Sequence, residues 1–142
     1  MKNKIYKLLT IFVITILFSG CSSMFAHLFG NDHLKDKKYN FLLFDDSNEK
    51  ILYGGYVEIL KVEDVKFSGE FRIIDVFSES IPIGSGKVEG KQNDDKDKAH
   101  MVFTASSTNE KIEIELNRTW NLLEGYWTYK NLGGKFIAFE NN

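Results

Sequence analysis

Cys21 carries the only thiol in the 142-residue sequence. A cysteine thiolate is a nucleophile, so its surroundings decide which chemistry it can enter. Lys2, Lys4 and Lys7 precede a largely apolar run over residues 8–18, which is the charged-then-apolar order of a secretory signal. An exported protein enters an oxidising space where thiols pair, yet Cys21 has no second cysteine to pair with. An export signal followed by a single cysteine therefore predicts that the Cys21 thiol carries a covalent modification other than a disulfide.

The apolar run is too short for a transmembrane helix. Such a helix needs roughly 20 apolar residues to cross about 30 Å of hydrocarbon, and Ser19 and Gly20 end the run here. We therefore expect residues 1–20 to form a signal helix that is removed after export. An ordinary signal ends with small residues at the first and third positions before the cut. The bulky Phe18 stands third before Cys21, so an ordinary cut at this place is not expected.

Residues 17–21, Leu-Phe-Ser-Gly-Cys, resemble the lipobox of bacterial lipoproteins, which more often carries Leu at the place of Phe18. The resemblance implies that Cys21 is the lipidation site, joined to diacylglycerol and palmitate-type chains, and becomes the first mature residue. Two or three acyl chains, at about 0.8 kcal/mol per buried methylene, would hold the protein firmly on a membrane. The expected location is the extracytoplasmic face of the cell membrane. Ser22, in place of an Asp, favours the outer membrane in a bacterium with two membranes. The alternative is an unmodified cysteine in a plain signal.

Three other patterns contain residue types that enzymes and ion sites use. Residues 84–87, Gly-Ser-Gly-Lys, lack the glycine spacing and the following helix of a phosphate loop. Residues 94–97 gather carboxylates but lack the glycine and the distal Glu of a calcium loop. Glu113 and Glu115 fall on the wet face of a predicted strand, without the apolar pocket that acid catalysis needs.

The histidines have no spacing that would assemble a metal site; they are His27, His33 and His100. We therefore expect no catalytic residue, no metal ion and no cofactor.

Composition indicates one folded domain after the signal. Residues 21–142 are long enough for a single core. Three of the 18 basic residues and none of the 20 acidic residues lie in the signal. Residues 21–142 therefore carry 15 basic and 20 acidic residues, which gives them a formal net charge of −5. This balance argues against nucleic-acid binding, which requires a basic surface. We expect a tether over residues 21–38 and a folded domain over residues 39–142. The apolar patch at residues 24–29 could form one helical turn at the membrane or cap the folded domain. The alternative is that it belongs to an unstructured spacer.

Apolar and polar residues alternate from Tyr39 onward, which is typical of half-buried strands. The alternation places Val65, Phe67, Gly69, Phe71 and Ile73 on one face of a strand. Residues 111–117 alternate in the same way. These runs predict antiparallel strands with one face in water.

Clusters of turn-forming residues separate the alternating runs, including those at residues 78–82, 118–121 and 131–134. We expect about eight strands, at residues 39–44, 51–61, 65–77, 83–92, 98–105, 111–117, 122–130 and 135–140. No helical segment separates them, so the connections are hairpins. The predicted fold is all-β, an antiparallel up-and-down meander that closes into a small barrel. A sandwich of two sheets is the alternative.

Glycines and large side chains share the predicted inner face. The glycines, which would let the strands coil sharply, are Gly69, Gly86, Gly90 and Gly125. The large side chains are Phe67, Phe71, Met101, Phe103 and Trp127. A barrel of eight strands has room for packed side chains or for one small ligand. The sequence thus predicts core packing and, as the alternative, a pocket with Phe71, Phe103 and Trp127 as ligand-binding residues.

Residues 123–127 and 133–137, Leu-Glu-Gly-Tyr-Trp and Gly-Gly-Lys-Phe-Ile, resemble the Gly-x-Trp strand and the following hairpin of calycin barrels, the lipocalins and avidins. In those families the motif lies on the first strand, whereas here it lies on the next-to-last. The resemblance implies a carrier or sensor of a small apolar ligand. None of the avidin biotin ligands has a counterpart in this sequence.

The sequence favours a non-enzymatic binding or interaction module of the cell envelope, anchored to a membrane by its N-terminal lipid. Its expected partners are the membrane and an envelope protein. The alternative is the calycin-like carrier of a small apolar ligand, and an enzyme ranks third. Aromatic residues filling the barrel would favour the first function, and a connected apolar cavity would favour the second.

Overall fold

The computed structural model describes residues 34–141 apart from 79, 94–97 and 120–121. Cys21, Trp120 and the carboxylate cluster within residues 94–97 therefore lie outside the described residues. Among those that are described, no helix has the length and apolar character needed to cross a bilayer. Residues 34–142 form one compact unit, and Leu34, at its start, packs against the hydrophobic core.

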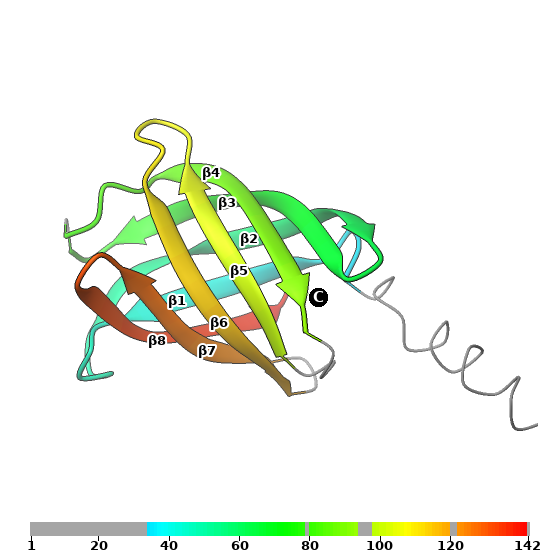
Figure 1. Cartoon of the computed structure of the whole chain (residues 1–142). Coiled ribbons are helices and arrows are strands. Elements are labelled where there is room, and N and C mark those ends of the chain that lie inside the picture. The colour runs from blue at the N-terminus through cyan, green and yellow to red at the C-terminus, as the bar shows by residue number, and fades with distance from the viewer. Residues whose placement is uncertain (1–33, 79, 94–97, 120–121, 142) are drawn as a thin grey trace, which may run out of the picture. The chain divides into compact units, whose positions relative to one another are not determined.

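Eight strands form a closed antiparallel barrel, which confirms the predicted fold (Figure 1). They are β1 (Lys38–Phe44), β2 (Ile51–Glu63), β3 (Lys66–Val76), β4 (Ser85–Gln92), β5 (Lys98–Ala105), β6 (Lys111–Thr119), β7 (Leu122–Tyr129) and β8 (Leu132–Glu140). Each strand pairs with the next in the chain, and β8 pairs with β1 to close the barrel. The alternative prediction, a sandwich of two sheets, is therefore wrong.

Alternation along each strand builds the core. In β1, Tyr39, Phe41 and Leu43 are buried and the residues between them are partly exposed. In β5, Met101 and Phe103 point inward in the same way. Full burial of one such side chain contributes roughly 1.5–3 kcal/mol. Because side chains on a strand alternate between its two faces, the period-two pattern fixes which residues meet inside.

The meander gives the barrel two distinct ends. The entry end holds the start of β1, the β2–β3 hairpin and the C-terminus, and the far end holds the connections β1–β2, β3–β4, β5–β6 and β7–β8. A turn leads the chain into β1 at the entry end. There the Asp36 N–H donates to the Ile59 carbonyl at 2.8 Å, and the Ile59 N–H donates to the Lys37 carbonyl at 2.9 Å. Lys37 also pairs with Glu140.

Several strand limits differ from the predicted ones. Val65 lies in the β2–β3 turn and not on the inner face of β3, which begins at Lys66. β6 continues to Thr119, so Arg118 and Thr119 belong to a strand and not to the turn predicted at residues 118–121. The turn predicted at residues 131–134 comprises only Lys130 and Asn131. Lys130 takes a positive φ of 54°, a conformation that permits a tight reversal and lets β8 begin at once.

All four glycines predicted to face inward do so by register. Gly69 pairs with Ile59, Gly90 with Met101 and Gly125 with Leu116, residues that are buried in the core. Gly86 pairs with the buried Phe71 and Ala105. At Gly90 the ring of Phe67 occupies the place of a side chain, because a Cβ built there would lie 2.1 Å from its Cζ.

Asp45 holds the β1–β2 turn together. Its carboxylate accepts hydrogen bonds from the Ser47 hydroxyl at 2.9 Å and from the N–H groups of Glu49 and Lys50 at 3.0 and 3.2 Å. Desolvation acts to raise the pKa of Asp45, but these hydrogen bonds and the Lys50 charge together lower it.

We expect this turn to loosen in acid. Because folding lowers the pKa of Asp45, the carboxylate favours the folded turn above its unfolded pKa of about 3.9. That contribution to stability is lost as the pH falls through the lower pKa that Asp45 has in the folded state. Amide exchange at Glu49 and Lys50, corrected for the intrinsic pH dependence, should show reduced protection in this range. Asp45→Asn should show no such pH step, and a step that persists in this variant would contradict the assignment.

Candidate functional site

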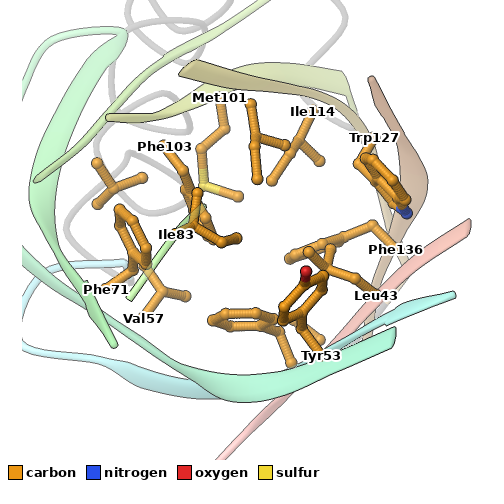
Figure 2. Packing of buried hydrophobic residues seen from close by; sticks show 14 of the residues in the cluster. Leu43, Tyr53, Val57, Phe71, Ile83, Met101, Phe103, Ile114, Trp127 and Phe136 are labelled. Carbon is orange, nitrogen blue, oxygen red and sulfur yellow. The ribbon is translucent and has the colours of Figure 1, made fainter. Parts of the chain in front are cut away.

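Aromatic side chains from several strands point into the interior of the barrel (Figure 2). Phe71 of β3 and Phe103 of β5 stack with centroids 4.4 Å apart and planes 8° from parallel. Phe41 meets Phe103 edge-on at 5.3 Å and stacks on Phe136 at 5.7 Å. Such pairs contribute about 0.5–1.5 kcal/mol each beyond their buried area. The position at which a calycin barrel would hold its ligand is therefore occupied by packed side chains.

Trp127 of β7 lies across the barrel from Phe71 (Figure 2). A hydrogen bond from its side chain links β7 to the end of β1. Its ring is fully buried, with 0% exposure, and its Nε1–H donates to the Phe44 carbonyl at 2.8 Å. Gly134 of β8 pairs with Trp127 of β7, and a Cβ on Gly134 would lie 2.1 Å from that same carbonyl oxygen. The absence of a side chain at Gly134 lets β1 approach closely enough for the tryptophan bond.

A short segment closes the far end of the barrel. Ile81 and Ile83, in the β3–β4 connection, are buried at 3% and 8% exposure. The Tyr53 hydroxyl accepts from the Ile81 N–H at 2.8 Å and donates to the Ile81 carbonyl at 3.1 Å. We call residues 81–83 the plug. The turn predicted at residues 78–82 lies within this connection between β3 and β4. The strand predicted from residue 83 begins too early, because β4 begins only at Ser85.

Tyr53→Phe should destabilise the domain by about 1–2 kcal/mol, because the buried N–H and carbonyl of Ile81 would both lose their partner. The effect is measured by urea unfolding, together with amide exchange at Ile81. Tyr126→Phe is the control, since Tyr126 is 49% exposed. Equal stability of the two variants would contradict an anchoring role for the Tyr53 hydroxyl.

An apolar cavity remains at the entry end. Its volume is about 40 Å³, against roughly 300–1,000 Å³ for typical ligand pockets. It is lined by Leu34, Tyr39, Val57, Ile59, Phe67, Gln92, Lys98, Ala99, Met101, Leu116 and Leu123. Phe71, Phe103 and Trp127, the residues predicted to bind a ligand, are absent from this lining and lie in the packed core.

The polar candidates lie apart on the surface. His100 Nδ1 contacts Glu115 Oε1 at 2.7 Å, between two side chains that are 38% and 71% exposed. Glu113 is likewise exposed. Gly84 and Ser85 are exposed where β4 begins, and a strand follows them where a phosphate loop would need a helix. Within the described part of the chain, no three His, Cys, Asp or Glu side chains come together in a way that could hold a metal ion.

Comparison of the chain with protein-family models, curated proteins and solved structures found no match. Two features of the geometry distinguish the candidate functions. One is the packed lumen around Phe103, and the other is the small cavity beside Leu34.

Proposed function

We propose that this protein is a lipid-anchored, non-enzymatic interaction module of the bacterial cell envelope, attached to its membrane through Cys21. The observation that carries the proposal is the packed lumen. Aromatic rings occupy its centre, the plug closes its far end, and the apolar cavity at the entry end measures about 40 Å³. A barrel filled in this way offers its outer surface and its ends to partners, because little internal space is left for a ligand.

The N-terminal segment supports anchoring. Residues 17–21 resemble a lipobox, and Cys21 has no other cysteine with which to pair. The segment from Cys21 to Leu34 can extend to at most about 45 Å. A lipid on Cys21 would hold the barrel within that distance of the membrane surface, where it would meet other envelope proteins.

A carrier of a small apolar ligand is the second candidate, and the entry cavity is the observation that favours it. Nearly all of its lining is apolar, as a carrier site requires. Its volume of about 40 Å³ would hold only the end of a hydrocarbon chain. Binding of a larger ligand would therefore require side chains such as Met101 and Phe67 to move.

Cys21→Ser should leave an unprocessed precursor without lipid, because the thiolate is the nucleophile to which the lipid is transferred. Metabolic labelling with a fatty acid, followed by gel electrophoresis, measures both lipidation and cleavage. Ser22→Ala is the matched control and should keep the label. Label on the Cys21→Ser protein, or normal maturation of it, would overturn the proposed anchor.

A further inference from the structure

β3 continues past the point at which β4 begins. The β3–β4 register ends where Arg72 pairs with Ser85, and one more bond follows, from the Ile73 N–H to the Gly84 carbonyl at 2.6 Å. Beyond this bond, β3 pairs with β2 alone among the described residues. No described strand pairs with the β4 side of residues 74–77, the last residues of β3 and Phe77 after it, and this side is here called the open edge.

The backbone N–H and carbonyl of Val76 point away from β2, toward the open edge. The Phe77 N–H donates to the Leu52 carbonyl of β2 at 2.9 Å. Successive N–H groups of a strand point to opposite sides, so the N–H and carbonyl of Val76 point to the open side. Unpaired backbone groups at a sheet edge are a template for another extended chain. Because backbone donors and acceptors of this kind pair with those of another strand, the partner that fits the open edge is an extended segment of chain.

Side chains make the open edge unusually apolar. Ile74, Val76 and Phe77 are 63%, 56% and 65% exposed, whereas the other exposed large hydrophobic side chains of the described residues reach at most 49%. Proteins usually protect an open edge with lysine, proline or a covering segment. Here the single charge within the edge is that of Asp75, which is exposed and forms none of the ion pairs found among the described residues.

We propose that the open edge binds an extended segment of a partner protein by β-strand addition. The segment would carry apolar side chains at alternate positions and a Lys or Arg facing Asp75, since backbone pairing gives affinity and side chains give selectivity. A second copy of this chain fits less well, because its own residues 74–77 would bring no cation to Asp75. The inference rests on the proposed interaction function and names the surface that performs it.

A library of random twelve-residue peptides, displayed on phage, tests the proposal against residues 22–142 without lipid. The strand pairs of the barrel all lie within residues 34–142, so this chain retains the whole fold. Enriched peptides should alternate apolar residues and carry a Lys or Arg. Their binding should weaken by about tenfold or more in Val76→Pro, which removes the donor on the open side. Leu60→Lys, which changes an exposed residue at the β2 bulge, should bind them unchanged.

Phe77→Lys is the second variant, because it keeps every backbone donor and places a charge on the edge. It should also weaken binding by about tenfold. Circular dichroism and thermal unfolding check that each variant is folded. Peptides that bind both edge variants as well as wild type, or a library without enriched peptides, would overturn the proposal. So would a wild-type dimer that Val76→Pro dissociates. None of these readouts involves lipid, so failure here is distinct from failure of the Cys21 anchor.

Discussion

Trp127→Ala is expected to lower the free energy of unfolding by about 3–5 kcal/mol, the usual cost of removing a large buried aromatic side chain. The ring is fully buried, so its removal would leave a cavity between β7 and the end of β1. The Phe44 carbonyl would also lose the indole N–H that it accepts at 2.8 Å. Urea unfolding followed by circular dichroism measures the loss without depending on tryptophan emission.

Trp127→Phe separates the two contributions, because it keeps most of the buried ring and removes only the hydrogen bond. It should cost about 1–2 kcal/mol, the usual range for a buried hydrogen bond and a small cavity. A loss below about 1 kcal/mol for Trp127→Ala would mean that the ring is not a core residue.

Emission should report the same burial. In Trp120→Phe the remaining Trp127 should fluoresce at short wavelength and resist acrylamide quenching. In Trp127→Phe the remaining Trp120 should be red-shifted and readily quenched, as the sequence predicts for a residue between two strands. The reverse assignment would place β7 one residue out of register.

Strand periodicity made the inner face predictable from the sequence. Gly125, Trp127 and Tyr129 alternate with Glu124, Tyr126 and Thr128, and the structure buries Trp127 and Tyr129. A period of two reports which face each residue occupies, and burial of one face then fixes the register. The eight-stranded barrel and the inward positions of Phe71 and Phe103 could be inferred for this reason.

The plug and the open edge could not be inferred in this way. Ile81 and Ile83 stand in a stretch rich in Ser, Pro and Gly, which is typical of a surface turn. The backbone of Ile81 is bonded to the Tyr53 hydroxyl, 28 residues away in sequence, and local patterns do not report such contacts. The open edge depends on the relative lengths of β3 and β4, because only β4's late start at Ser85 leaves residues 74–77 uncovered. The apolar pair Ile81 and Ile83 was the one local signal of the plug.

Gly125→Ala should destabilise the barrel by about 3 kcal/mol, at the upper end of the usual cost of overpacking. A Cβ on Gly125 would lie 1.9 Å from the carbonyl oxygen of Glu115 and 2.9 Å from its carbon. These are backbone atoms of β6, so the two strands would have to separate along a register that also holds Trp127 opposite Ile114. Urea unfolding at neutral pH measures the change, and the emission of Trp127 should shift to the red if the pair opens.

Two further glycines provide matched controls for Gly125→Ala. Gly84→Ala should have little effect, because Gly84 is exposed and a Cβ there meets nothing within 4 Å. Gly90→Ala should fall between the two, since its Cβ would meet the Phe67 ring at 2.1 Å. That ring borders the entry cavity and has space into which it can turn, whereas the Glu115 carbonyl is held in the sheet. If Gly125→Ala proved as mild as Gly84→Ala, β6 and β7 would not approach as closely as the fold requires.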